Sequence, residues 1–216
     1  MPPWYGPGAT LDSVAVVVVL LLCGSLQERS ANAAVLDVVR QRAVATGATV
    51  IDFAALREVP PFDADRVDAP GDAVDALRTA IGAADAVVIA GPEYAGSLAG
   101  ALKNALDWIV GSGELYGRVV GVVSAGTTGG VHAREVLVRT LVWQGAQVVG
   151  SLGIEAPRTK SGADGRFTDA ETVAAIAALT DVVLGASARS AADRLALRRT
   201  VAEVAGVDPA RIPDES

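Results

Sequence analysis

The sequence predicts an α/β fold in which a parallel sheet of five strands is covered by helices on both faces. Five short apolar runs typical of strands alternate strictly with five segments of helical periodicity. The central runs are apolar at every position, as in parallel strands that are buried on both faces. The chain has 216 residues, of which 51% are hydrophobic and 20% are charged, so it can form one large domain with a sizeable core.

The first strand is predicted over residues 14–23, where ten consecutive residues are apolar and mostly valine or leucine. A membrane-spanning helix needs about 20 apolar residues, so this run is too short to cross a bilayer. No Lys or Arg precedes the run, and the bulky Leu22 stands where a signal peptide needs a small residue. We therefore expect a buried central strand, no membrane association and a cytoplasmic protein.

The next elements follow in order. Residues 30–45 place their valine and leucine side chains on one side of a helix. Residues 47–54, GATVIDFA, are rich in strand-forming residues and are expected to form the second strand. Residues 56–70 contain two adjacent prolines, which exclude regular structure there. Residues 72–83 return to helical spacing, and residues 84–91, ADAVVIAG, are expected to form the third strand.

The second half of the chain repeats this alternation. A helix is expected over residues 98–110, and the apolar run GRVVGVVSAG at residues 117–126 is the fourth strand. Residues 129–144 form a helix after a glycine-rich loop, and residues 146–154, AQVVGSLGI, form the fifth strand. A polar loop then leads to the last core helix, at residues 169–184.

The two ends of the chain are expected to lie outside this domain. Residues 1–13 are rich in proline and glycine and are expected to form a flexible leader, so that the domain itself spans residues 14–185. Residues 186–216 are expected to form a C-terminal helical extension, in which Arg194 and Arg198 share one face. This extension is either a solvated amphipathic helix, or a subunit contact or a site for a nucleotide phosphate.

Charge and residue counts exclude several classes of function. The formal net charge of −7 repels phosphate backbones, so we expect no nucleic-acid partner. The single cysteine, Cys23, excludes an internal disulfide, and with the single histidine, His132, it cannot form a Cys/His zinc site. We therefore expect no metal. His132 could act as a general base, although a lone histidine on a helix is more commonly a surface residue.

In open parallel sheets, ligands bind beyond the carboxyl ends of the strands, where the strand order reverses. Three unusual loops leave such ends, and the first is GSLQERSAN at residues 24–32. It opens a helix, and a helix N-terminus favours a phosphate. Ser25, Ser30 and Asn32 can donate hydrogen bonds, and Arg29 adds a positive charge. The alternative interpretation is an ordinary helix cap formed by Ser30.

The second loop is PEYAGS, which follows the third strand. It consists of Pro92, Glu93, Tyr94, Ala95, Gly96 and Ser97. The proline stiffens the exit from the strand, and the small residues leave the backbone bare, so that a planar ring could approach its N–H groups. The alternative is a long loop in which Ser97 caps the next helix.

The third loop is SAGTTGG, residues 124–130, in which Ser124, Gly126 and Gly129 offer donors with little side-chain bulk. Taken together, the three loops predict one cleft along the edge of the sheet. A phosphate is expected at one end of this cleft and a flat group at the other.

These motifs resemble those of the NADPH-dependent FMN reductase family. GSLQERSAN is similar to the family's GSLRxxSxN loop, and PEYAGSLAGALKNALDW is similar to its PEYNxSxPGxLKNxLDW signature. SAGTTGG and LVWQGAQVV fall where that family has its glycine-rich loop and its following strand entry. The resemblance covers about residues 14–184 and implies a flavodoxin-like three-layer fold with strand order 2-1-3-4-5.

The resemblance also implies FMN as the cofactor and NAD(P)H as a co-substrate. The flavin phosphate would lie on Ser25, Gln27, Arg29, Ser30 and Asn32. The ring would lie against residues 92–97, with Ser124, Gly126 and Gly129 on its other side.

Three positions depart from the family pattern. Gln27 stands in place of the usual arginine, Ala95 in place of the usual asparagine and Ala99 in place of the usual proline. We expect the first two to weaken FMN binding or to change the choice of acceptor without removing the site.

The implied activity is that of an NAD(P)H-dependent, FMN-containing oxidoreductase. Hydride passes from the nicotinamide to FMN and then to a small acceptor: a quinone, free flavin, azo compound or metal oxyanion. This cycle needs no protein acid or base, so no catalytic side chain is predicted. The alternatives are an FMN-binding electron carrier, and a flavin-free scaffold or regulatory relative, which the changes at Gln27 and Ala95 would explain.

The resemblance further implies a homodimer or homotetramer. Family members commonly assemble through the helix that follows the second motif. In this chain that helix carries Leu102, Leu106, Trp108 and Ile109, which we expect at the subunit interface.

Overall fold

The computed structural model describes residues 16–188 of the chain. The expected leader and all but the first residues of the expected C-terminal extension, including Arg194 and Arg198, lie outside this range. The last helix continues to Ser187, two residues beyond the expected end of the domain.

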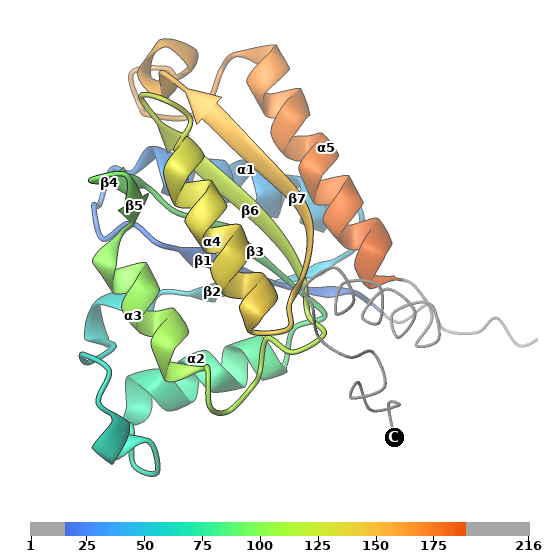
Figure 1. Ribbon diagram of the computed structural model, residues 1–216. Coiled ribbons are helices and arrows are strands. Elements are labelled where there is room, and N and C mark those ends of the chain that lie inside the picture. Colours follow the sequence, from blue (N-terminus) through green and yellow to red (C-terminus); the bar gives the residue numbers. More distant parts are fainter. Residues whose placement is uncertain (1–15, 189–216) are drawn as a thin grey trace, which may run out of the picture.

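A five-stranded parallel sheet forms the centre of the molecule (Figure 1). Its strands are β1 (Val18–Cys23), β2 (Thr49–Phe53), β3 (Ala86–Ala90), β6 (Val119–Gly126) and β7 (Gln147–Glu155). The strand order is β2-β1-β3-β6-β7, and every neighbouring pair is parallel. Counted within this sheet alone, the order is 2-1-3-4-5, so the predicted flavodoxin-like topology is confirmed.

Helices cover both faces of the sheet, as predicted. The helices α1 (Ala31–Ala45) and α5 (Ala170–Ser187) lie on one face (Figure 1). The other face is covered by α2 (Asp72–Gly82), α3 (Gly100–Trp108) and α4 (Val131–Trp143).

The apolar run of β1 is divided between two cores. Leu20 and Leu22 belong to the cluster under α2, α3 and α4, whereas Val19 and Leu21 belong to the cluster under α1 and α5. This division follows from the two-residue repeat of a strand. It explains why the run is apolar at every position.

The helix α5 has the length and apolar composition of a membrane span. Three of its large side chains, Ile176, Leu179 and Val183, are buried in the core on the α1 face of the sheet. A core helix of this kind passes the same test of length and composition, so the helix is accounted for by packing within the domain.

Two connections are more regular than the sequence predicts. The predicted loop over residues 56–70 overlaps the short 3-10 helix η1 (Ala55–Glu58) and contains η2 (Ala64–Arg66), one on each side of the prolines. The predicted loop after β3 is a hairpin of β4 (Glu93–Tyr94) and β5 (Ser97–Leu98). A third short 3-10 helix, η3 (Pro157–Lys160), follows β7.

The expectation that Trp108 and its neighbours form a subunit interface is wrong. The α3 residues Leu102, Leu106, Trp108 and Ile109 are each only 1% exposed, within the chain's own core. The Trp108 indole N–H donates to the carbonyl of Pro60 at 2.7 Å, and the ring meets that of Phe62 edge-on with centroids 5.2 Å apart. The proline-rich connection therefore covers the helix face that the sequence suggested would be free.

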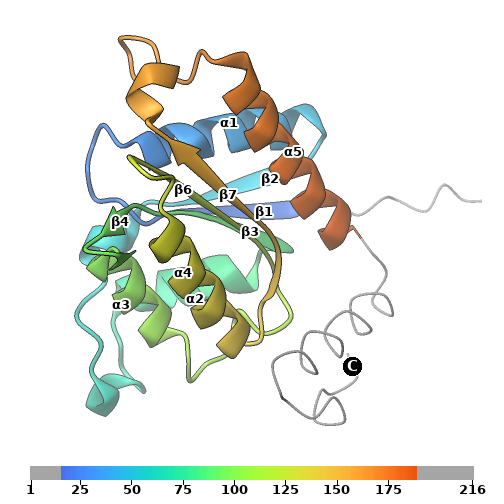
Figure 2. The same ribbon diagram turned by 45° about the horizontal axis from the view of Figure 1, so that its top comes forward.

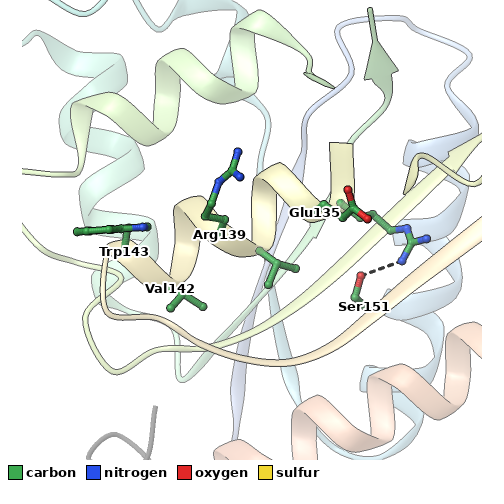
Figure 3. A pocket seen from close by; sticks show the side chains of 7 residues that line it. Glu135, Arg139, Val142, Trp143 and Ser151 are labelled. Atoms are coloured by element: carbon green, nitrogen blue, oxygen red, sulfur yellow. Dashed lines mark hydrogen bonds between the residues drawn. The ribbon is translucent and has the colours of Figure 1, made fainter. Parts of the chain in front are cut away.

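An exposed aromatic side chain lies on α4 instead. Trp143 at the end of α4 is 83% exposed. It lies beside a groove of about 470 Å³ between α4 and β7, lined by Arg134, Glu135, Val138, Arg139, Val142, Trp143 and Ser151. Figure 3 shows Trp143, Val142, Arg139 and Glu135 along the helix, with Ser151 projecting from β7.

Candidate functional site

The three predicted loops begin side by side at the carboxyl edge of the sheet. The amide of Gly24 donates to the carbonyl of Ala90 at 2.8 Å, and the amide of Gly91 donates to the carbonyl of Val123 at 3.0 Å. These hydrogen bonds extend the ladders of β1, β3 and β6 by one step. The loops therefore leave neighbouring strands at the same level, as expected for a ligand site in this fold.

Asn32 connects the first loop to the third. Its side-chain amide donates to the carbonyl of Ala125 at 3.1 Å, and its side-chain oxygen accepts from the amide of Ala125 at 2.9 Å. The residue is 3% exposed. Its side chain is therefore committed to holding the two loops together, and it can influence a phosphate only through the shape of the loop.

The other four predicted residues of the first loop lie at or just before the N-terminus of α1, where a ligand could bind. Ser30 caps α1 by accepting from the amide of Asn32 at 3.1 Å, which leaves its own O–H free to donate. The Ser25 hydroxyl accepts from the amide of Gln27 at 3.3 Å. Gln27 and Arg29 have exposed side chains. The loop thus combines hydroxyl, amide and guanidinium donors at a helix N-terminus, a donor set suited to phosphate.

Arg57 is a residue that sequence reasoning missed. It projects from η1 and donates from its guanidinium to the carbonyl of Leu26 at 2.6 Å. It therefore brings a positive charge to the first loop, in which Gln27 replaces the family's usual arginine. Arg57 and Leu26 lie 31 positions apart, so only the fold reveals this contact.

The second loop is a tight hairpin. Tyr94 pairs with Ser97, and the two residues between them, Ala95 and Gly96, have positive φ angles of 51° and 70°. Two positive φ angles in a two-residue turn are the signature of a type I′ hairpin. The small residues of this segment are therefore required in part by the turn, and they also leave its backbone accessible.

Glu93 connects the hairpin to the start of α4. Its carboxylate accepts from the amides of His132 and Ala133 at 2.9 and 3.1 Å. The helix α4 lacks a cap of its own, since its N-cap is Gly130 and its first turn contains no acidic residue. Glu93 thus caps α4 from another element, which occupies this helix N-terminus and leaves that of α1 for an anion.

The third loop is closely packed beneath its surface. Ser124 is 1% exposed, and among residues 16–188 its hydroxyl has no hydrogen-bond partner. A side chain at Gly130 would collide with this hydroxyl, so glycine is required there. The carbonyl of Gly129 accepts from the Arg134 guanidinium at 2.9 Å. Ser124 therefore supports the loop from below and is not on its exposed surface.

Open space borders the hairpin and the third loop. A Cβ atom built on Gly96 or on Gly126 meets no atom within 4 Å. Side chains at these positions would project into that space, whereas glycines leave the backbone bare beside it. An exposed backbone at one end of the edge and phosphate donors at the other fit the ring and the phosphate of FMN.

The described residues supply no obvious acid–base or metal site. Within residues 16–188 no group of three or more His, Cys, Asp or Glu side chains could hold a metal ion. Burial raises the pKa of the Cys23 thiol, so this residue is a neutral thiol near pH 7 and not a thiolate nucleophile. The side chain of His132 is 67% exposed, and its imidazole lies 3.8 Å from the Glu135 carboxylate.

Comparison with known proteins identifies the family of the chain. A family model described as NADPH-dependent FMN reductase matches residues 17–157. The chain is 34% identical over 137 residues to a quinone reductase of Escherichia coli (strain K12), an alignment that covers 61% of this chain and 72% of that protein. It is 36% identical over 80 residues to an NADPH azoreductase of Bacillus sp. (strain OY1-2), covering 37% of this chain and 45% of that protein.

The fold is also similar to that of solved structures. FerB, a flavoenzyme NAD(P)H:(acceptor) oxidoreductase from Paracoccus denitrificans, superposes with a TM-score of 0.65 at 24% identity. The superposition covers 79% of this chain and 96% of FerB. At this level of identity the likeness establishes the shared fold. Because the family model matches more than half of the chain and includes all three loops, the chain belongs to the NADPH-dependent FMN reductase family.

Proposed function

We propose that the protein is an NAD(P)H-dependent oxidoreductase that holds FMN along the three connected loops and reduces a small two-electron acceptor. One observation carries this proposal: hydrogen bonds between Asn32 and Ala125 join the first loop to the third, and Glu93 holds the hairpin against the start of α4 by accepting from His132 and Ala133. A bound FMN would supply the hydride-transfer chemistry. The chain's own residues bind and orient the cofactor.

The proposed phosphate end of the site consists of Ser25, Gln27, Arg29 and Ser30, with Arg57 as an additional cation. The proposed ring end consists of residues 92–97 and the backbone of Gly126, with Ser124 beneath it. The predicted Gly129 is buried, and its N–H donates to the carbonyl of Gly126 at 3.2 Å, so it can act only through the shape of the loop. Asn32 joins the loop of the phosphate end to Ala125, next to Gly126 of the ring end. The hydroxyls of Ser25 and Ser30 and the two arginines give this end of the site donors for a phosphate, although the net charge of the chain is negative.

We propose a quinone as the first acceptor to test, because relatives of the chain include a quinone reductase. In this reaction NAD(P)H loses a hydride and becomes NAD(P)⁺. The quinone gains two electrons and two protons, one arriving with the hydride and one from water, and becomes a hydroquinone. Solvent can supply that proton at the exposed hairpin, where Tyr94 is 55% exposed.

The test begins with flavin binding. The purified protein is mixed with FMN, desalted and examined by visible absorption. NADPH is then added without oxygen, followed by a quinone. Retained flavin that NADPH bleaches and a quinone restores is the expected result.

Other outcomes would contradict the proposal in different ways. Retained flavin that neither NADPH nor NADH bleaches would indicate an electron carrier. A protein that neither retains FMN nor oxidises a nicotinamide in the presence of excess FMN would indicate a flavin-free relative. An azo compound, free flavin and a metal oxyanion complete the panel of acceptors.

We further propose a cytoplasmic homo-oligomer. The groove on α4 combines the exposed Trp143 with cations from Arg134 and Arg139 and the anion of Glu135. A patch that carries both signs of charge around an apolar centre suits pairing with its own copy about a two-fold axis. The free thiol of Cys23 is compatible with a reducing compartment.

A further inference from the structure

A second cavity lies next to the first loop, here called the phosphate loop (residues 24–32), on the α1 side of the sheet. Its volume is about 540 Å³, and it separates the β1–α1 loop from the connection between β7 and α5. Figure 2 shows this connection over the start of α1. Three arginines from the two segments line the cavity: Arg29, Arg158 and Arg166. Such a group of cations is notable in a chain with a net charge of −7.

These arginines have few partners in the protein. Within the described range, Arg29 and Arg158 make no hydrogen bond or ion pair. Arg166 lies 3.8 Å from the Asp164 carboxylate, and both side chains are mostly exposed, so this pair contributes little. By contrast, Arg42 on the same face of the sheet makes a two-pronged pair with Asp181 at 2.8 and 2.9 Å. The cavity arginines are thus available to a ligand.

Three acidic residues also line the cavity and limit what it can bind. Asp37 is held by Arg40, and Asp164 accepts from the backbone amide of Arg166 at 3.1 Å as well as facing its side chain. Glu28 remains, so the formal charge of the lining is zero, three cations against three anions. Such a site disfavours a polyphosphate, because the acidic side chains would repel its several negative charges. It suits a single phosphate that accepts paired hydrogen bonds from guanidinium groups.

The rest of the lining suits a flat base. Ala31, Ala33 and Ala34 of α1 and Pro157 of η3 present small apolar surfaces to the cavity. Guanidinium groups also stack on aromatic rings. The cavity further includes Gln27 and Ser30 of the phosphate loop, so a dinucleotide that reaches the flavin edge could extend its far end into it.

We propose that this cavity binds the adenosine 2′-phosphate end of NADPH through Arg158 and Arg166, so that these two arginines set a preference for NADPH over NADH. The inference rests on the proposed reductase function. It assigns the arginines of the β7–α5 connection, which lie outside the FMN residues, to the selection of the nicotinamide cofactor.

The test uses the FMN-loaded protein with a quinone acceptor. Steady-state rates with NADPH and with NADH are measured for the wild type, Arg158→Gln, Arg166→Gln and the double variant. Arg66→Gln on η2 is the control, because it removes the same charge from an exposed residue beside the helices of the other face. Binding of 2′,5′-ADP and of 5′-AMP by calorimetry gives a readout that is independent of turnover.

The double variant is expected to raise KM for NADPH by about tenfold or more, the effect of losing a hydrogen bond to a charged group. KM for NADH, kcat and the FMN dissociation constant should stay at wild-type values. The wild type should bind 2′,5′-ADP more tightly than 5′-AMP, and the double variant should lose this difference.

Two results would overturn the inference while leaving the reductase function intact. One is equal use of NADPH and NADH that the double variant does not alter. The other is weakened FMN binding in Arg158→Gln with an unchanged KM for NADPH, which would assign the cavity to the flavin phosphate. Failure of the reductase function itself is recognised separately, because the wild type would then oxidise neither nicotinamide.

Discussion

Ala95 occupies a backbone conformation that alanine disfavours. Its φ of 51° lies in the left-handed region, where an L-residue with a Cβ is strained by about 1–2 kcal/mol. Asparagine tolerates this region, and Asn-Gly is a preferred pair for the two central positions of a type I′ turn. The family signature has asparagine at this position. The alanine therefore replaces a residue that suits the turn better and that has a polar side chain.

Ala95→Asn is therefore expected to stabilise the protein. The gain should be about 1 kcal/mol in the free energy of unfolding, or a rise of roughly 2–4 °C in Tm for a domain of this size. Thermal unfolding without FMN measures this effect. FMN affinity, measured by titration, should also increase.

Ala95→Gly separates the two contributions. Glycine relieves the backbone strain but offers no side-chain amide. If the asparagine variant binds FMN more tightly than the glycine variant, the amide itself contributes to binding. A lower Tm for Ala95→Asn than for the wild type would contradict the assignment of a type I′ turn.

Single residues also show where sequence reasoning reaches its limit. The family signature identifies Asn104 and Trp108, but it does not reveal their role. Both donate to the carbonyl of Pro60, at 2.8 and 2.7 Å, across more than 40 positions of sequence. A large aromatic residue on a helix can be an interface residue or a core residue, and only the path of the proline-rich connection decides between them.

At the scale of elements, α4 depends on a residue from outside the helix. Gly130 at its N-cap has no side chain, and Glu93 of β4 supplies the acceptor that Ser or Asp would normally provide. The same two hydrogen bonds hold the hairpin against the first turn of α4, which directly follows the third loop. Removing the carboxylate should therefore affect both the stability of the domain and the geometry of the flavin edge.

Glu93→Ala is expected to lower the free energy of unfolding by about 1–2 kcal/mol, the usual cost of losing an N-cap acceptor. It should also weaken FMN binding, because the hairpin is no longer held against α4. Glu93→Gln keeps an acceptor oxygen but removes the charge, so its loss of stability should be smaller. Chemical denaturation and FMN titration of the two variants measure these effects.

Glu58→Ala is the matched control for the Glu93 variants. Glu58 lies on η1, is exposed, and its side chain makes no hydrogen bond or ion pair within residues 16–188. Its removal should change stability very little. If Glu93→Ala were as stable as this control, Glu93 would not be the cap of α4.

Most elements could be predicted because their local patterns agree with their environment. The five strands of the sheet are apolar runs of the expected kind, and each helix predicted within the domain is present within a few residues. The hairpin was missed for a physical reason. Alanine at its first turn position lacks the Asn, Asp or Gly that usually announces a type I′ turn, and each strand contains only two residues.

At the scale of the whole molecule, the sequence identified the edge that carries the site but not how its parts are joined. The predicted topology brings the three loops to neighbouring strand ends. The hydrogen bonds that connect these parts involve the side chains of Asn32 and Glu93. The partner of Asn32 is 93 positions away in the sequence, and the partners of Glu93 are about 40 positions away. The same holds for the arginine-lined cavity, since Arg29 and Arg158 come from distant segments.

The α4 groove allows a prediction about assembly. Trp143→Glu should shift the proposed oligomer toward smaller species, because a charge would replace the apolar centre of the contact. The loss of an aromatic interface residue typically costs about 2 kcal/mol or more, which weakens subunit association about 30-fold. Since Trp143 is 83% exposed, the substitution should leave the fold of each subunit unchanged. Light scattering over a range of concentrations measures the effect.

Val44→Glu on α1 provides the control, because Val44 is also apolar and exposed but lies on the opposite face of the sheet. It should not change the mass in solution. Circular dichroism and FMN retention would verify that both variants are folded. A wild type that stays monomeric at every concentration would contradict the proposal, and so would an oligomer that Trp143→Glu leaves intact, since the groove would then face solvent in the assembled protein.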